Sequence, residues 1–178
     1  VAGTRPRSLD TVEDERLESQ LLKMSKEQLE HRLVVDSLET TFRELCADFS
    51  QDTAPSVLKL SRVQHLRTAF SGELKDGVGD DAILRAFHPT PATCGSPCDS
   101  AARFIAENEP FDRGWYAGPV GFVSRDEAEF AVAIRSMLWL GRKTHVFAGA
   151  GIVVGSESER EWNELEDKIA GVLHLLAP

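Results

Sequence analysis

The stretch GWYAGPVGFVS, residues Gly114–Ser124, decides the fold class together with two apolar runs that follow it, AEFAVAIRSMLWL (Ala128–Leu140) and THVFAGAGIVVG (Thr144–Gly155). All three runs are rich in apolar, β-branched or aromatic residues, and turn residues separate them. We therefore expect three consecutive antiparallel strands, followed by an amphipathic helix over Glu159–Leu176.

The first half of the chain has helical periodicity and then short alternation. Helical spacing of apolar residues predicts a long helix over Lys26–Asp48, with Ser25 as its N-cap and Gln28 at the capping-box position. These apolar residues are Leu29, Leu33, Leu38, Phe42 and Leu45. Val and Leu then predominate over Ser56–Leu74, which predicts one or two strands. DDAILRAF, Asp80–Phe87, predicts a short helix.

The middle of the chain is expected to be a loop and then a helix. HPTPATCGSPC, His88–Cys98, contains three prolines and a glycine, so it should form a loop. DSAARFIAENE, Asp99–Glu109, should form a helix after an Asp or Ser cap. Helices and antiparallel strands together predict an α+β fold, in which the sheet packs on helices in two layers.

The composition excludes several classes of protein. A chain of 178 residues fits one domain, and its net charge of −9 argues against nucleic-acid binding. It contains no run of about eighteen apolar residues that would span a membrane. Cys46, Cys94 and Cys98 suit a reducing compartment and lack zinc-like spacing to other ligands. Because the chain opens at Val1 without Met, we expect a fragment, a processed product or one part of a longer chain.

Two Glu-x-x-Glu pairs are candidates for a metal site. SKEQLEH places Glu27 and Glu30 three residues apart on one predicted helix, and EWNELEDK does the same for Glu161 and Glu164 on another. If the two helices meet, the repulsion among four carboxylates calls for a cation, and oxygen-only ligands suit Mg²⁺. The alternative is that both faces are solvated, with Glu164 paired to Lys168.

Three further features have a structural and a functional interpretation. The glycine-rich AGAGIVVGS could hold an anion on its backbone amides, or it could simply be a tight turn. Arg135 lies within an apolar run, where an inward arginine must find an anion and an outward one needs no partner. Tyr116 either packs in the core or contacts a ligand. No serine lies in a G-x-S-x-G context, and the histidines lack metal-ligand spacing.

Eight motifs in order resemble one family: AGTRPR, SKEQLEH, VQHL, HPTPATCGSP, EPFDRGWYAGPVGF, EFAVAIRS, FAGAGIVVGS and EWNELEDK. They are similar to those of the chorismate-utilising enzymes, which include isochorismate, salicylate, anthranilate and aminodeoxychorismate synthases. The resemblance covers essentially the whole chain. HPTPATCG is similar to the isochorismate and salicylate branch, and the P-x-G-S/T-x-x-G-A-P-K loop of the amine-transferring branch is absent. The tail GSESEREWNELEDKI is similar to plant and algal isochorismate synthases, which implies the plastid stroma, with the cytoplasm as the alternative.

The resemblance implies a Mg²⁺ site and a substrate site. Glu30 and Glu164 match the metal ligands, while Glu27 and Glu161 match neighbours that support them from further out or through water. The metal would hold the ring carboxylate of chorismate. Residues matching the substrate site are Tyr116, Arg135 and a backbone amide near Gly149 for the enolpyruvyl carboxylate, with Thr4, His65 and Lys168 lining the pocket.

The implied reaction is the isomerisation of chorismate to isochorismate, in which water adds at ring carbon 2 and the hydroxyl at carbon 4 leaves. The family's general base, a lysine, and its general acid, a glutamate, lie upstream of the AGT motif with which this chain begins. We therefore expect residues 1–178 to be roughly the C-terminal two-thirds of a single chorismate-binding catalytic domain, inactive without the missing segment or a complementary chain.

Two alternatives stay open at the level of sequence. One is salicylate synthase, which adds pyruvate elimination and shares nearly every motif, so the pathway fed (quinone or salicylate) is undetermined. The other is a non-catalytic structural or regulatory remnant of such an enzyme.

Overall fold

The structure is a computed structural model that describes residues 1–173, so the predicted helix end at Leu176 lies outside the described residues. Helices and antiparallel strands alternate irregularly along it, and this mixture confirms the α+β class. The helices are α1 (Thr11–Leu21), α2 (Ser25–Leu45), α3 (Asp80–Phe87), α4 (Cys98–Asn108) and α5 (Ser158–Leu173). The strands are β1 (Ala2–Pro6), β2 (Cys46–Gln51), β3 (Ser56–Lys59), β4 (Val63–Arg67), β5 (Phe70–Leu74), β6 (Pro119–Val123), β7 (Ala128–Val132), β8 (Ser136–Leu140) and β9 (Lys143–Phe147).

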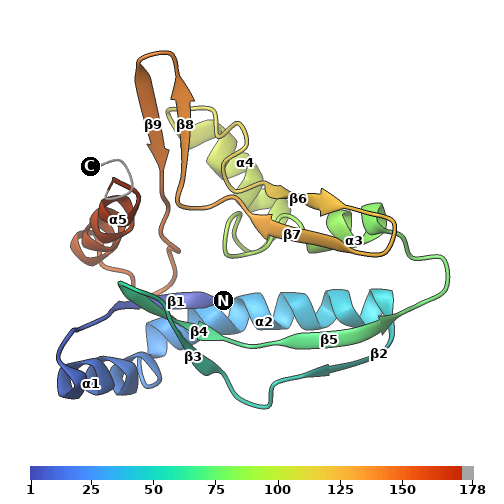
Figure 1. The fold of residues 1–178 in the computed structure, drawn as a ribbon, viewed down its shortest axis with the longest axis horizontal. Helices are drawn as coiled ribbons and strands as arrows, with labels where there is room; N and C mark the ends of the chain where they lie inside the picture. Colours follow the sequence, from blue (N-terminus) through green and yellow to red (C-terminus); the bar gives the residue numbers. More distant parts are fainter. Residues whose placement is uncertain (174–178) are drawn as a thin grey trace.

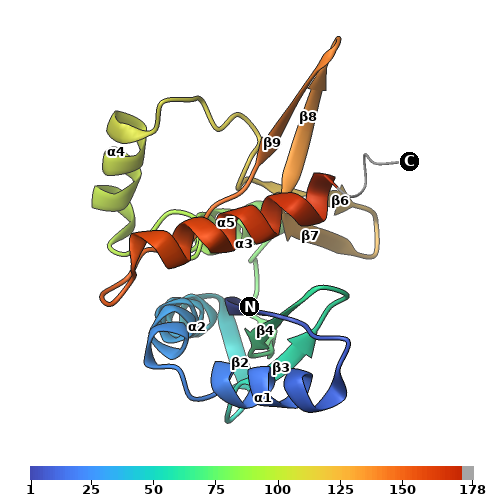
Figure 2. The ribbon, with the colours of Figure 1, turned by 90° about the vertical axis from the view of Figure 1, so that its left-hand side faces the viewer.

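Elements β1 to β5 form one layered half of the molecule with α1 and α2, and the later elements lie above it (Figure 1). This half contains an antiparallel sheet in the order β1-β4-β3 and a separate two-stranded sheet, β2-β5, and α2 packs against β1 and β2. The register of β1 on β4 places Thr4 opposite His65. The view turned by 90° shows α5 running over α2, so the two predicted carboxylate-bearing helices face each other (Figure 2).

Helix α2 differs from its prediction at both ends. It begins at Ser25 with Met24 as N-cap, and the side chain of Gln28 reaches back to the carbonyl of Leu22 instead of forming a capping box. It ends at Leu45, three residues before the expected Asp48, because the chain there becomes β2 and pairs with β5. Ladder hydrogen bonds along β2 therefore override the helical periodicity, which continues in the sequence past Leu45.

The strand predictions undercount the strands. Residues Ser56–Leu74 form three strands instead of one or two, and β1 was not predicted. The three later runs form four strands in two hairpins, β6-β7 and β8-β9, because the second run breaks between Val132 and Ser136. Arg135 adopts a left-handed backbone there, with φ of +49°, which turns the chain out of the strand direction.

Apolar side chains are buried mainly in the first half and exposed on the two late hairpins. Leu21, Val34 and Leu66 belong to the core, whereas Trp139 on β8 is 69% exposed. Other exposed apolar residues of these hairpins are Val120, Phe122, Val123, Phe130, Met137, Leu138 and Leu140. Each hairpin is a sheet of only two strands, so both carry apolar faces that nothing in residues 1–173 covers. No helix within that range is long and apolar enough to cross a bilayer.

Candidate functional site

A cavity of about 190 Å³ lies between the two halves of the molecule and gathers every predicted substrate-binding residue. We call it the polar cavity. Strand β1 supplies Thr4, β4 supplies His65, α2 supplies Glu30, and the later half supplies Tyr116, Arg135, Gly149 and Lys168. Its lining includes Thr4, Glu30, His65, Arg113, Tyr116, Arg135, Gly149, Gly151 and Lys168.

Arg135 is anchored in the polar cavity by a neutral histidine. A guanidinium nitrogen of Arg135 lies 2.8 Å from Nε2 of His65, and guanidinium only donates, so Nε2 must accept. The imidazole proton is then on Nδ1, which lies 3.2 Å from the carbonyl oxygen of Gly3 and 3.1 Å from the hydroxyl of Thr4. Burial, and then the charge of Arg135, lowers the pKa of His65 to about 4, which keeps the ring neutral.

The Arg135 guanidinium forms no ion pair within residues 1–173, although it is half-buried. Burial lowers its pKa, and the more distant negative charge of Glu164 opposes this only in part, so the guanidinium charge is poorly solvated. The break in the strand at Arg135 thus directs a cation into a cavity instead of into the core. Such a group is suited to receive a carboxylate with two hydrogen bonds.

Tyr116 forms the next part of the wall. Its ring stacks on Phe147, with the centroids 5.5 Å apart, and the Arg113 guanidinium lies 5.7 Å from the centroid of the tyrosine ring. Burial raises the pKa of Tyr116, so its hydroxyl remains a proton donor at neutral pH. A Cβ on Gly149 would come within 2.6 Å of that hydroxyl, so only glycine permits this close approach.

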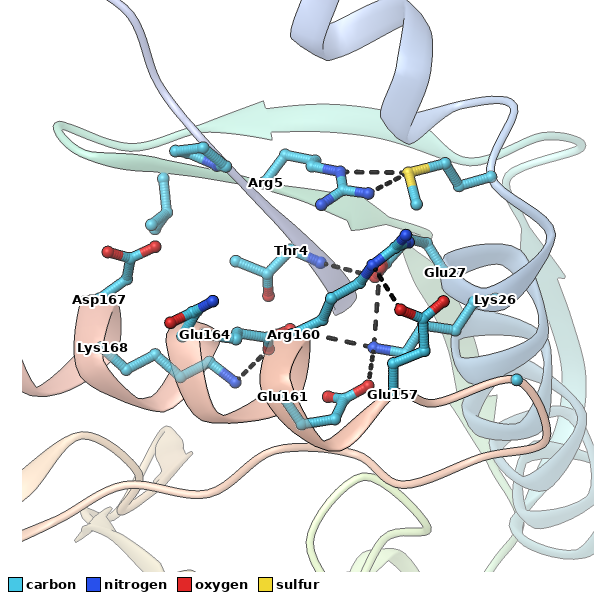
Figure 3. A pocket seen from close by; sticks show the side chains of 15 residues that line it. Thr4, Arg5, Lys26, Glu27, Glu157, Arg160, Glu161, Glu164, Asp167 and Lys168 are labelled. Atoms are coloured by element: carbon cyan, nitrogen blue, oxygen red, sulfur yellow. Dashed lines mark hydrogen bonds and ion pairs between the residues drawn. The ribbon is translucent and has the colours of Figure 1, made fainter.

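Three of the four carboxylates of the two Glu-x-x-Glu pairs, those of Glu27, Glu161 and Glu164, line a second pocket beside the polar cavity, which we call the acidic pocket (Figure 3). The ammonium nitrogen of Lys26 lies 2.7 Å from Glu161, 3.8 Å from Glu27 and 4.0 Å from Glu164. Glu27 also accepts a hydrogen bond of 3.1 Å from the backbone N–H of Thr4. The two helices therefore do meet, which was the condition for a metal site, and a lysine lies among their acidic side chains.

The expected Glu164–Lys168 pair forms inside the site instead of on a solvated face. Nζ of Lys168 lies 2.6 Å from Glu164 and donates to the carbonyl oxygen of Gly149 at 2.8 Å. Both side chains are less than one-fifth exposed. Lys168 thus ties α5 to the glycine-rich segment, and it borders both the acidic pocket and the polar cavity.

Glu30 lines the polar cavity and feels the charges of the acidic pocket. Burial, followed by the charges of Glu164 and Glu27, raises its pKa to about 7. Its carboxylate lies against the glycine-rich segment, because a Cβ on Gly151 would fall 2.7 Å from its Oε1. A carboxyl group with such a pKa is destabilised as an anion and would be relieved by a nearby cation.

The acidic pocket has the donors of a hard-cation site. Both carboxylate oxygens of the buried Glu161 lack a hydrogen bond within residues 1–173, although Oε1 makes the close charge contact with Lys26. In the observed conformation no three acidic, histidine or cysteine side chains of that range converge closely enough to hold a metal ion. Oxygen-only donors, of which Glu161 Oε2 has no partner and Glu161 Oε1 has only Lys26, would fit Mg²⁺ if the Lys26 ammonium moved aside.

The sequence interpretation missed two residues of the site. Lys26 lies directly beside Glu27 in the quoted SKEQLEH motif, but its position among the carboxylates depends on α5, which is far away in the chain. Arg113, within FDRGWY, forms a bidentate pair with Glu109 and donates to the carbonyl of Thr93 at 2.8 Å. The available signal for Arg113 was a charged residue one glycine away from the aromatic pair Trp115 and Tyr116.

The family of the chain follows from comparison with known proteins. The family described as chorismate binding enzyme matches residues 1–177. This chain therefore belongs to the chorismate-binding enzymes, which confirms the resemblance that its motifs suggest.

Individual relatives point to one branch of that family. The chain is 43% identical to chloroplastic isochorismate synthase 2 of Arabidopsis thaliana, over 96% of this chain and 30% of the relative. The solved structure of the menaquinone-specific isochorismate synthase MenF from Escherichia coli matches with a TM-score of 0.88 and 38% identity, over 99% of this chain and 41% of that chain. Anthranilate synthase component I from Streptococcus pneumoniae matches less well, with a TM-score of 0.80 and 28% identity, over 96% and 41%. The chain thus spans less than half the length of each.

Proposed function

We propose that this chain carries the carboxylate-binding and Mg²⁺-binding parts of an isochorismate synthase, which isomerises chorismate to isochorismate. The support is its membership of the chorismate-binding family and its higher identity to isochorismate synthases than to anthranilate synthase component I. No feature of the described residues favours salicylate synthase over this activity.

The observation that carries the proposal is the half-buried Arg135 with no anionic partner in the described part of the chain. Its guanidinium would bind the enolpyruvyl carboxylate of chorismate, and the Tyr116 hydroxyl would donate a further hydrogen bond. His65 holds Arg135 in place from behind, because its Nδ1–H is committed to the backbone of Gly3. A neutral histidine here leaves the full positive charge of Arg135 available to substrate.

For the metal, Glu30 and Glu164 would be the ligands, with Glu27 and Glu161 supporting them. Bound Mg²⁺ would neutralise and orient the ring carboxylate of chorismate. Lys168 keeps Glu164 aligned through its 2.6 Å ion pair and positions the Gly149 backbone at the same time. The metal would then bind the ring carboxylate of the substrate, while Arg135 and Tyr116 would bind its enolpyruvyl carboxylate.

Proton transfer needs a general base for the water and a general acid for the leaving hydroxyl. Lys168 is already engaged by Glu164 and the Gly149 carbonyl, so it is poorly placed to act as the base. We assign neither role to a residue of this chain. The remaining part of the domain, joined to this chain or separate from it, would supply both groups.

The exposed apolar faces of β6-β7 and β8-β9 suit that remaining part of the domain. They would be covered by further strands and helices, which explains why residues 1–173 leave them open. The isolated chain should therefore be inactive and prone to association. The name of the Arabidopsis thaliana relative, a chloroplastic protein, supports a plastid location.

The test is to incubate the complete polypeptide that contains this chain with chorismate and Mg²⁺ and to follow isochorismate by chromatography. Glu164→Gln should reduce turnover by at least about a hundredfold, since it removes a proposed metal ligand and its pair with Lys168. Glu166→Gln, an exposed neighbour on the same helix, is the matched control. Full activity of Glu164→Gln would contradict the metal site, and salicylate as the direct product would favour the alternative enzyme.

A further inference from the structure

Two cysteines face each other beside the polar cavity. The sulfur of Cys98, the first residue of α4, lies 3.6 Å from the sulfur of Cys94 in the preceding loop. Both are free thiols, Cys98 being exposed and Cys94 partly buried. The separation exceeds a disulfide bond length of about 2.05 Å by an amount that side-chain rotation can close. Gly95, with φ of +114°, provides the tight turn between them.

This loop is coupled to the wall of the polar cavity. Thr93, directly before Cys94, lines the cavity, and its carbonyl oxygen accepts a hydrogen bond of 2.8 Å from Arg113. Arg113 in turn lies over the Tyr116 ring. A covalent change at Cys94 would thus reach Tyr116 through only Thr93 and Arg113.

We propose that Cys94 and Cys98 form a dithiol site that low-molecular-weight disulfides oxidise to an intramolecular disulfide, which restrains the Thr93 wall of the polar cavity. The exposed Cys98 thiolate attacks the small disulfide, whose S–S bond breaks and releases one thiol that carries the proton from Cys98. Cys94 then attacks the Cys98 sulfur of the mixed disulfide. The Cys94–Cys98 bond forms, and the second small thiol leaves with the proton from Cys94. The chain loses two electrons and two protons, and the small disulfide is reduced to two thiols.

The structure sets the order of these steps. Burial, and then the neighbouring Cys98 thiol, raises the pKa of Cys94, so this sulfur is mainly protonated until the mixed disulfide places an electrophile beside it. Cys46 is buried on β2, on the other half of the molecule, and serves as an internal reference. A resting dithiol agrees with the reducing compartment that the cysteine content suggests.

The experiment treats the chain with oxidised glutathione, blocks remaining thiols under denaturing conditions, and digests with trypsin. Both cysteines fall in one tryptic peptide, Ala86–Arg103, which should appear unblocked and about 2 Da lighter than its dithiol form. Cys94→Ser should stop at a glutathione adduct on Cys98, and Cys98→Ser should give no internal bond. Two blocked cysteines, or stable glutathione adducts on the unsubstituted peptide, would overturn the proposal.

Two further measurements address the role of the fold. Bond formation should be at least about tenfold faster in the native chain than in urea, because the structure holds the sulfurs together. Equal rates would mean that the sequence spacing alone, and not the structure, makes the site. Oxidation should also slow hydrogen exchange in peptic fragments that contain Arg113 and Tyr116, and unchanged exchange there would refute the coupling to the cavity.

Discussion

Replacing Glu30 by glutamine should stabilise the metal-free chain at pH 8 and abolish its response to Mg²⁺. Burial and the charges of Glu164 and Glu27 hold the pKa of Glu30 at about 7, against an ordinary value of 4.5. The folded chain therefore binds this proton more tightly than the unfolded chain does. Glutamine removes the charge and nearly preserves the shape of the side chain.

The size of the effect follows from linkage between proton binding and folding. Because the folded-state pKa is the higher one, wild-type stability from this group is fully present below about pH 4.5 and is lost as the pH rises through about 7. At ~1.4 kcal/mol per pH unit, that loss is about 3 kcal/mol at most. The substituted glutamine cannot ionise, so the variant should equal wild type near pH 4 and exceed it by up to that amount at pH 8.

Urea unfolding of the metal-free chain at pH 4.5, 6, 7 and 8, with and without Mg²⁺, measures both effects. Wild type should gain about 2.7 kcal/mol when Mg²⁺ is a hundredfold above its Kd, and Glu30→Gln should gain none. Glu44→Gln, on the exposed side of the same helix, should change stability by less than about 0.5 kcal/mol at every pH. A Glu30→Gln variant that is less stable than wild type at pH 8 would refute the reasoning, because the carboxylate would then be a favourable contact.

Three further predictions concern the same pockets. Calorimetry should find Mg²⁺ binding about tenfold weaker at pH 6 than at pH 8, because Glu30 must lose its proton, with a pKa near 7, before it binds. Gly151→Ala should lower Mg²⁺ affinity, because its Cβ would lie 2.7 Å from the Glu30 carboxylate. Gly171→Ala on α5, where the added Cβ meets open space, should instead raise the free energy of unfolding by about 0.8 kcal/mol. Lys26→Gln should lower the melting temperature of the metal-free chain and enlarge its rise on adding Mg²⁺, and exposed Lys23→Gln should change neither.

Much of the fold could be predicted because local pattern and tertiary structure agree in most segments. The helices at Asp80–Phe87 and after His88–Cys98 appear close to where capping and turn residues place them. The failures occur where long-range pairing decides. Strand β1 has little apolar alternation of its own and forms because it pairs with β4. Helix α2 ends where β2 begins, because the residues of β2 pair with β5.

In the candidate site, too, residue identities could be predicted from the sequence but long-range contacts could not. Residue types and the family resemblance single out Tyr116 and Arg135 for substrate and Glu30 for metal, and the structure places all three in the lining of the polar cavity. The pairing of Arg135 with His65 could not be inferred, because it joins a break in one strand to a residue 70 positions earlier. Sequence periodicity described Arg135 as part of a strand. The structure interrupts the strand at that residue so that the side chain can enter the cavity.

The charge balance of the acidic pocket is a second case in which a long-range contact, that of Lys26, could not be predicted. Counting carboxylates predicts a cluster of four that a cation must neutralise, and three of the four, Glu27, Glu161 and Glu164, lie within 4.0 Å of the Lys26 ammonium. In the observed conformation the chain supplies that cation itself, from the residue beside Glu27. An internal ammonium lets the two helices meet without a metal, so the proposed Mg²⁺ binding would be an exchange of one cation for another. On this proposal, metal affinity in the pocket would depend on where the Lys26 side chain goes as much as on the carboxylates that it leaves.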